Sequence, residues 1–189
     1  MTVPLSSLAR RSQRVVPPEM LQHFVETFLY AEEALLVDEI TRIDPDTRTL
    51  EALLDTTRDL PLSRAQRTSP LHPAHVSAAE ILMVTGGLGC LHAFLFHGCR
   101  WDEGWAGFGN RIHRADWKRL ALLGPPLALE SRETRTRVGA RRIVIRYAFC
   151  FRQAGEIVYQ GDQSAMFVKE RDLGALLSAA GTRTDDGMT

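Results

Sequence analysis

The sequence is poor in the residues that mark metal-binding and disulfide-rich proteins. It has three cysteines in 189 residues, with no Cys-x-x-Cys spacing and no histidine cluster around them. An odd number of scattered cysteines argues against both a disulfide framework and a structural zinc site. There is no glycine-rich phosphate loop and no dinucleotide fingerprint. We therefore expect neither a metal nor a cofactor.

The sequence predicts neither a secretory signal nor a membrane span. Residues 1–18 contain arginines but no apolar segment of the kind that signal peptides carry. The longest apolar run, Ile81 to Phe96, is shorter than the roughly 20 residues that a span needs, and it contains three glycines and His92. The run predicts a buried helix, and we place the protein in the cytoplasm.

The chain has no excess of either charge, because Lys plus Arg and Asp plus Glu both number 23. This balance predicts neither nucleic acid nor a membrane surface as a partner. The charges are nevertheless segregated: acids dominate from Glu32 to Asp59, and arginines dominate from Arg111 to Arg152. The second half therefore favours phosphate-bearing or acidic partners, with a solvated strand face as the alternative interpretation.

The first half of the chain predicts one helix, a hairpin and a loop. Residues 1–16 are polar and arginine-rich, which predicts a flexible N-terminal arm, and Pro17 and Pro18 then open a helix to about Tyr30. Strand patterns at 34–43 and 49–57 are separated by Asp44-Pro45-Asp46, a turn sequence. Residues 58–73 are rich in proline and serine and predict a loop.

The second half predicts a buried helix and a series of strands. A helix that is apolar on nearly all faces runs from about 76 to 96, and strand patterns follow at 105–117, 126–137, 141–152 and 156–169. Residues 171–189 predict a C-terminal tail that is disordered at its end. The order favours one α+β domain at 17–170, a curled antiparallel sheet around one long apolar helix.

This order, with a histidine just before the central helix and a glutamate in its first turns, resembles the hot-dog superfamily of acyl-thioester enzymes. The segment His75-Val76-Ser77-Ala78-Ala79-Glu80 is similar to the His-Phe-Asn-Ala-Val-Glu stretch of the FcoT-like long-chain acyl-CoA thioesterases. The asparagine of that family falls on Ser77, and an upstream tyrosine falls on Phe28 with Tyr30 nearby. A histidine in a proline-containing loop, followed by a helix glutamate, resembles 3-hydroxyacyl carrier-protein dehydratases more distantly.

The resemblance implies hydrolysis of an acyl thioester of coenzyme A or acyl carrier protein, in fatty-acid or polyketide-type metabolism. A 3-hydroxyacyl-thioester dehydratase is the alternative reaction. A third possibility is a non-catalytic hot-dog subunit that partners a related chain. The resemblance also implies a homodimer or a heteromer with another hot-dog chain.

Three residues are the catalytic candidates. Histidine is the residue type whose native pKa lies near neutrality, so a positioned His75 could remove a proton from water or substrate, or it could only satisfy backbone groups. Glu80 interrupts an apolar helix, so it must face an opening, pair with another group or stay protonated. Ser77 is either a catalytic hydroxyl or the helix N-cap, with Glu80 completing a capping box. Backbone N–H groups at this helix start would polarise the thioester carbonyl.

Other residues are candidates for binding. His72, Gly86 and Tyr30 are predicted to contact the substrate, and Gly86 in particular lowers helix propensity and would leave room for a thin acyl chain. Helix packing is an equally good reason for that glycine. Arginines around the expected turn at Gly139 are predicted to meet the phosphates of coenzyme A or an acidic carrier protein. These are Arg132, Arg135, Arg137, Arg141 and Arg142.

Overall fold

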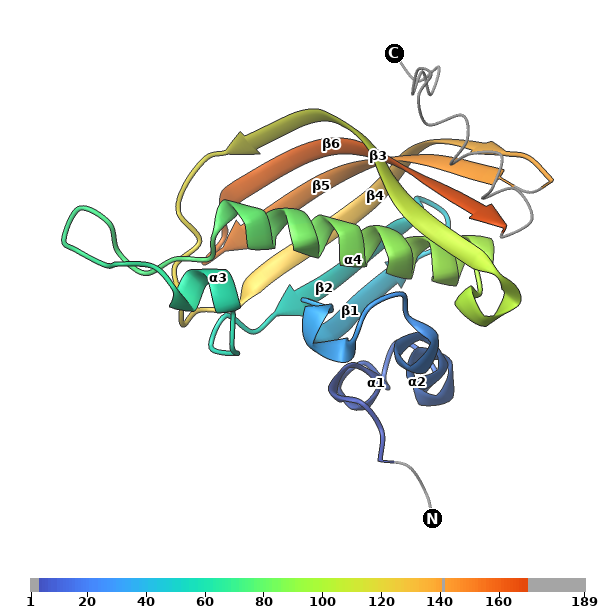
Figure 1. The fold of residues 1–189 in the computed structure, drawn as a ribbon, viewed down its shortest axis with the longest axis horizontal. Helices are drawn as coiled ribbons and strands as arrows, with labels where there is room; N and C mark the ends of the chain where they lie inside the picture. Colours follow the sequence, from blue (N-terminus) through green and yellow to red (C-terminus); the bar gives the residue numbers. More distant parts are fainter. Residues whose placement is uncertain (1–3, 141, 170–189) are drawn as a thin grey trace.

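The computed structural model describes residues 4–140 and 142–169 and places one long helix inside a curled sheet (Figure 1). The helices are α1 (Ser7–Arg11), α2 (Pro18–Thr27), α3 (Pro61–Arg64) and α4 (Ala78–His97), with short 3₁₀ turns η1 (Glu32–Ala34) and η2 (Trp101–Glu103). The strands are β1 (Glu39–Asp44), β2 (Thr49–Leu54), β3 (Trp105–Trp117), β4 (Leu127–Val138), β5 (Arg142–Gln153) and β6 (Glu156–Lys169).

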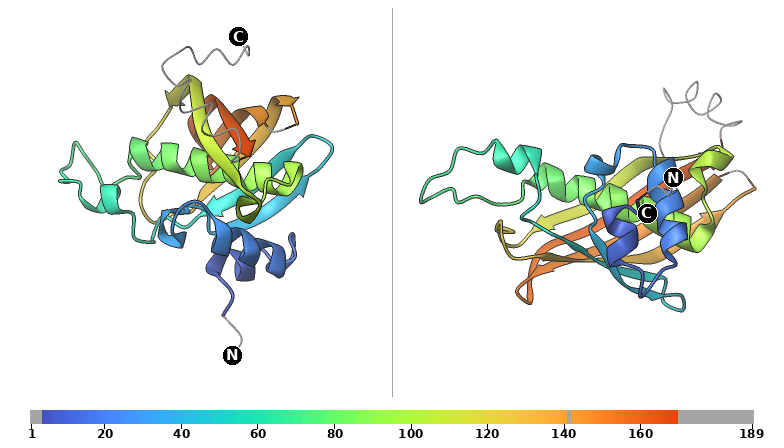
Figure 2. Two further views of the ribbon diagram at one scale, coloured as in Figure 1. Left: turned by 45° about the vertical axis from the view of Figure 1, so that its right-hand side comes forward. Right: turned by 90° about the horizontal axis from the view of Figure 1, so that it is seen from below.

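The sheet has six antiparallel strands in the order β1-β2-β4-β5-β6-β3. It curls around α4, while α1 and α2 pack on the side of β1 (Figure 2). Strand β3 follows α4 in the chain but pairs with β6, so β1 and β3 are the two edges. The predicted α+β architecture of a curled sheet around one apolar helix is confirmed.

Alternation of apolar and polar residues in β5 explains which face of the sheet meets α4. Every second side chain of β5 is buried, as expected for a strand with one covered face. Arg142 and Arg152 are exposed on the other face. The side chains of β5 that are buried on this face include Ile143, Ile145, Tyr147, Phe149 and Phe151.

Helix α4 is the centre of the core. It is long and apolar enough to cross a membrane by length and composition, yet 61% of its most apolar window is buried inside the protein. Ser77 caps its start, and Gly98 ends it with a left-handed backbone (φ +63°) that favours glycine. The predicted buried helix at 76–96 therefore matches α4 within two residues.

The N-terminal segment differs from the predicted flexible arm. Ser6 caps α1 by accepting from the Ala9 N–H (3.2 Å), Leu8 and Ala9 are buried, and the Ser12 hydroxyl accepts from the Ile40 N–H of β1 (2.8 Å). The arginine-rich composition conceals these few apolar residues, which become a buried face only when β1 is beside them. The folded unit thus begins before Pro17, and the predicted tail at 171–189 lies outside the described residues.

A charged cluster, the Glu133 cluster, joins the C-terminal end of α4 to β4. His97 Nε2 lies 2.7 Å from Glu133 Oε2, and His92 Nε2 lies 3.5 Å from the same oxygen. Thr136 donates to Glu133 Oε1, and Arg48 Nη1 lies 3.9 Å from Glu133 Oε2. Burial opposes ionisation, but the nearby His92 ring and the hydrogen bonds from His97 and Thr136 outweigh it and hold the pKa of Glu133 far below its usual range. The carboxylate therefore stays charged.

We expect Glu133→Gln to lower the free energy of unfolding at about pH 7 by about 2 kcal/mol, because charge-assisted hydrogen bonds are lost. The pKa of Glu133 is lower in the folded chain, so its stabilisation is complete above about pH 5 and falls as the pH drops below about 4.3. Burial also lowers the pKa of His92. The unfolded chain therefore binds a proton at His92 more readily than the folded chain does, and the free energy of unfolding falls further as the pH drops below about 6.5.

Urea unfolding of both proteins at several pH values measures this difference, which should shrink as the pH approaches about 3. Glu130→Gln is the matched control, since Glu130 lies on the same strand and borders a hollow on the other face of the sheet. A constant difference between wild type and Glu133→Gln at every pH would contradict the role assigned to this carboxylate.

Candidate functional site

The start of α4 is a capping box, as one of the two interpretations of Ser77 predicts. Ser77 Oγ accepts from the Glu80 N–H (3.2 Å), and the Glu80 carboxylate accepts from the Ser77 N–H (3.2 Å). Helix α3, in the loop before α4, supplies further donors to Glu80: the Leu62 and Ser63 N–H groups (2.9 and 3.2 Å) and the Ser63 hydroxyl. Both oxygens of Glu80 are therefore engaged.

Glu80 is completely buried and ionised. Burial opposes ionisation, but the hydrogen bonds from Ser63 and Ser77 outweigh it and hold the pKa of Glu80 below its usual value. A carboxylate with no exposed surface and both oxygens bonded within the protein has no position from which to reach a substrate. The structure therefore gives Glu80 and Ser77 a structural role and leaves their predicted catalytic role without support.

His75 and His72 lie outside this cap. His75 Nδ1 is 2.8 Å from the Pro73 carbonyl oxygen, so Nδ1 carries the proton in this arrangement and Nε2 is the basic nitrogen. His75 lines a cavity of about 380 Å³ at the N-terminal end of α4, which we call the N-terminal cavity; Ala78, Ile81 and Tyr159 also line it. His72 is exposed, and its ring centroid lies 5.1 Å from that of His75. His75 and Glu80 do not share a cavity.

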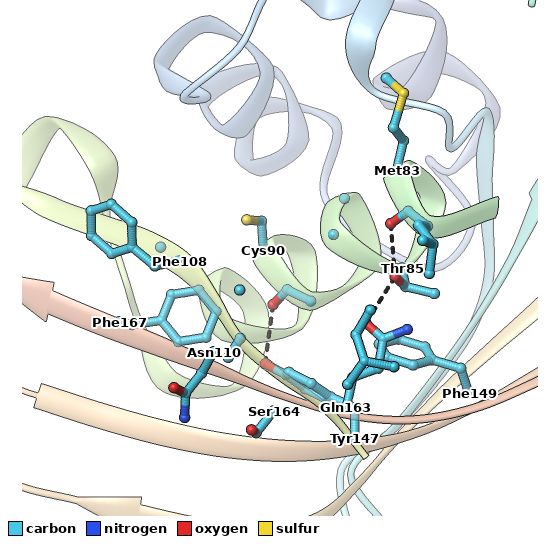
Figure 3. A pocket seen from close by; sticks show the side chains of 18 of the residues that line it. Met83, Thr85, Cys90, Phe108, Asn110, Tyr147, Phe149, Gln163, Ser164 and Phe167 are labelled. Carbon is cyan, nitrogen blue, oxygen red and sulfur yellow. Dashed lines mark hydrogen bonds between the residues drawn. The ribbon is translucent and has the colours of Figure 1, made fainter. Parts of the chain in front are cut away.

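A larger pocket, which we call the central pocket, lies between α4, β3 and β6 (Figure 3). Its volume is about 560 Å³, within the range of small-molecule sites. Its walls are mainly apolar, and Tyr30 and Gly86 are among them, whereas His72 is not. The apolar lining includes Phe28, Leu82, Met83, Phe108, Ile112, Phe149, Ala165 and Phe167.

A few neutral polar groups face this apolar space. The Thr85 hydroxyl lies 2.8 Å from the Leu82 carbonyl oxygen and 3.1 Å from Gln163 Oε1, so one proton serves two acceptors. Gln163 Nε2 donates to Tyr159 Oη (2.8 Å), and Asn110 also lines the pocket. Figure 3 shows the side chain of Gln163 meeting Thr85 from the opposite wall. Such groups orient a polar ligand head without adding charge.

Three glycines of α4 differ in what surrounds them. A Cβ on Gly87 would lie 3.2 Å from Leu35 Cδ1, and one on Gly89 would lie 3.5 Å from the Tyr147 ring. A Cβ on Gly86 would meet nothing within 4 Å and would enter the central pocket. Close packing thus accounts for Gly87, whereas Gly86 lowers helix propensity without any packing reason. An open pocket is the remaining reason for it.

The central pocket has weak acid–base chemistry of its own. No carboxylate and no imidazole are among its lining residues in the described part of the chain, and Arg111 is the charged side chain among them. Burial, with a smaller effect from Cys99, raises the pKa of the Cys90 thiol to about 12, so this thiol is not a nucleophile at neutral pH. The pocket suits a mainly apolar ligand.

Thr85, Asn110 and Gln163 are site residues that the sequence analysis did not single out. Gln163 could have been found from the alternation in β6. Every second residue of this strand faces inward, and Tyr159, Gly161 and Phe167 lie on the same inward face as Gln163. A half-buried glutamine among those positions is a polar group on an otherwise apolar face and needs a reason. Asn110 sits where the pairing of β3 with β6 shifts register, which the sequence does not reveal.

The predicted carrier-binding arginines lie away from the central pocket. Arg132 and Arg135 border a hollow of about 610 Å³ on the outer face of the sheet, and Arg146 in the same hollow binds Asp162 through two 2.8 Å contacts. Arg137 and Arg142 are exposed near the neighbouring ends of β4 and β5. Arg141 lies outside the described residues. The sheet separates the hollow from the central pocket.

Neither protein-family models nor curated protein sequences match this chain. Solved structures do: a mutant of the thioesterase PA1618 from Pseudomonas aeruginosa has a TM-score of 0.54 at 14% identity, covering 82% of this chain and 96% of that one. The thioesterase HI1161 from Haemophilus influenzae has 0.51 at 13% identity (79% and 91%). The dehydratase heterocomplex ApeI:P from Xenorhabdus doucetiae has 0.56 at 12% identity (81% and 96%).

These likenesses, at 12–14% identity, establish the fold. The chain has the hot-dog fold, as its sequence predicts. The neighbours named here include both thioesterases and a dehydratase, so the reaction has to be inferred from the site itself.

Proposed function

We propose that this protein binds an acyl thioester with the acyl chain in the central pocket, and that it hydrolyses the thioester. The observation that carries the proposal is the combination of an apolar pocket of about 560 Å³ with the neutral polar groups of Thr85, Asn110 and Gln163. The pocket follows α4 from Leu82 to Cys90, which at 1.5 Å per residue is a length of about 12 Å. That shape fits a linear acyl chain better than a compact polar metabolite.

Hydrolysis fits the site better than dehydration does. Dehydration of a 3-hydroxyacyl thioester needs both a base at the α-carbon and an acid at the hydroxyl. His75 of the N-terminal cavity can supply the base, but Glu80, the acid that the resemblance implies, is enclosed in the helix cap. In hydrolysis, water attacks the thioester carbonyl carbon, the C–S bond breaks and the thiolate leaves with a proton. Polarisation by N–H groups and one base, His75, are sufficient for this step.

A non-catalytic acyl-binding subunit is the second candidate. It is favoured by the burial of Glu80 in the cap, which removes the acid or base that the resemblance implies. In that case the protein would hold an acyl chain for a related hot-dog chain that carries out the reaction.

Partners and location follow from the same proposal. Phe108 and Ile112 are exposed on the edge strand β3, beside Met83 of α4 and Tyr30. An edge strand with apolar side chains favours pairing with another chain, which supports a homodimer or a heteromer with another hot-dog protein. The thioester would be carried by coenzyme A or acyl carrier protein in the cytoplasm. The arginines of β4 and β5 would meet the carrier only where it extends over the outer face of the sheet.

An assay of thiol release tests the proposal. With saturated acyl-CoA or acyl carrier protein, we expect free thiol at a rate that His75→Ala lowers by about 100-fold or more, the usual contribution of a positioned base. His72→Ala is the matched control, because His72 is exposed in the same loop. Binding of acyl-CoA without thiol release would favour the non-catalytic subunit, and an enoyl absorbance with 3-hydroxyacyl substrate would favour dehydration.

A further inference from the structure

The central pocket and the N-terminal cavity lie in series along α4. Leu82 and Thr85 line the central pocket, and Ala78 and Ile81 line the N-terminal cavity. Strand β6 contributes to both in the same order, with Gln163 at the central pocket and Tyr159 at the N-terminal cavity. The two spaces are therefore neighbours between the same two elements.

A hydrogen-bonded chain of three side chains stands between the two spaces. It runs from Thr85 on α4 through Gln163 to Tyr159, with contacts of 3.1 and 2.8 Å. Tyr159 is fully buried, and its ring folds over Gly161, where any Cβ would collide with the Tyr159 hydroxyl. The missing side chain at Gly161 thus allows the Tyr159 hydroxyl to reach Gln163.

These three hydrogen-bonded side chains would cost folding free energy if their role were only structural. Gln163 is half-buried and its two hydrogen bonds are partly buried. Polar groups removed from water need their partners in place, and an apolar side chain at position 163 would fill this space with less risk. Tyr159 and its neighbours Phe151 and Trp117 already pack by ring contacts of 5.2 and 5.4 Å between centroids. Packing alone therefore does not require an amide between the two cavities.

We propose that Gln163 is a partition that selects acyl-chain length. This inference rests on the proposed function, with the thioester beside His75 in the N-terminal cavity. Short acyl groups then remain in that cavity, whereas longer ones enter the central pocket only when the Gln163 side chain turns away from Tyr159 and Thr85. The joined path from Ala78 to Cys90 is about 18 Å long, against about 12 Å for the central pocket alone.

Binding of saturated acyl-CoA of increasing chain length tests the partition. We expect Gln163→Ala to bind the longest chains about tenfold more tightly than wild type, because two partly buried hydrogen bonds no longer have to be broken. Affinity for short chains should stay unchanged. Tyr159→Phe keeps the ring, removes one of the two bonds and should shift the profile less, in the same direction. It also provides the test if Gln163→Ala folds poorly.

Gln160→Ala is the matched control, because Gln160 is the same residue type on β6 but borders the hollow on the outer face of the sheet. It should bind every chain length as wild type does. A profile that neither Gln163→Ala nor Tyr159→Phe changes, while Gly86→Phe weakens long-chain binding, would overturn the partition and leave the acyl pocket intact. Wild-type protein that binds no acyl-CoA of any length would overturn the proposed function itself.

Discussion

Glu80→Ala is expected to lose about 4 kcal/mol of unfolding free energy, one of the largest effects of any single substitution in this chain. Removal of the carboxylate leaves the N–H groups of Leu62 and Ser63 and two serine hydroxyls without their acceptor, and the Ser77 N–H keeps only the Ser63 hydroxyl. Each buried group left unpaired costs about 1–3 kcal/mol, part of which water entering the site recovers. The loss is a large share of the stability of a typical domain.

Urea unfolding followed by circular dichroism measures this loss, and two variants show where it comes from. Ser77→Ala removes only the cap hydroxyl and should cost about 1 kcal/mol. Glu103→Ala removes an exposed glutamate and should cost almost nothing. If Glu80→Ala unfolded at the wild-type urea concentration and only lost turnover, Glu80 would be catalytic after all.

Gly86→Phe is expected to weaken binding of a long-chain acyl-CoA by about 100-fold without unfolding the protein. A side chain at Gly86 enters open space in the central pocket and touches nothing else within 4 Å at its Cβ. Displacing roughly four methylene groups, at about 0.8 kcal/mol each, corresponds to about two orders of magnitude in affinity. Any residue other than glycine or proline is also a better helix former at this position.

Calorimetric titration with acyl-CoA and a thermal melt measure the two parts of this prediction. Gly86→Ala should raise stability by roughly 0.5–1 kcal/mol and change binding little. Gly87→Ala should raise stability less than Gly86→Ala does, because its Cβ would lie 3.2 Å from Leu35 Cδ1 and not in open space. Size-exclusion chromatography of Gly86→Phe checks that assembly is unchanged. Wild-type affinity for long chains in Gly86→Phe would show that the acyl chain lies elsewhere.

The fold was predictable because its main signals are local. The alternation in 143–151 predicts which face of β5 is buried, and the apolar residues of 78–97 predict a helix that needs cover on most sides. The spacing of Ser77 and Glu80 likewise contains the capping box, since a box depends on residues three apart. These patterns repeat within one or two turns or strands, so no long-range contact is needed to recognise them.

The candidate site was predictable only in part, because its residues come from distant segments. Gly86 and Tyr30 do line the central pocket, but Gln163 meets Thr85 across 78 positions of sequence, through a pairing of β6 that no local pattern specifies. His75 is separated from Glu80 because α3 folds back and supplies the Ser63 donors that enclose the carboxylate. Sequence patterns relate only residues that are close in the chain. For this reason the predicted catalytic residues all lie at the start of one helix.

The sequence by itself determined the helix, the strands, the cap and hence the hot-dog architecture, since each depends on the backbone and its near neighbours. Tertiary structure alone decided that the arginine-rich N-terminus packs on β1 and that Glu80 is enclosed. It also decided that Gly86 faces open space, whereas Gly87 faces Leu35. The physical reason is that burial and hydrogen-bond satisfaction are properties of what surrounds a residue, and those surroundings exist only once the sheet has closed around α4.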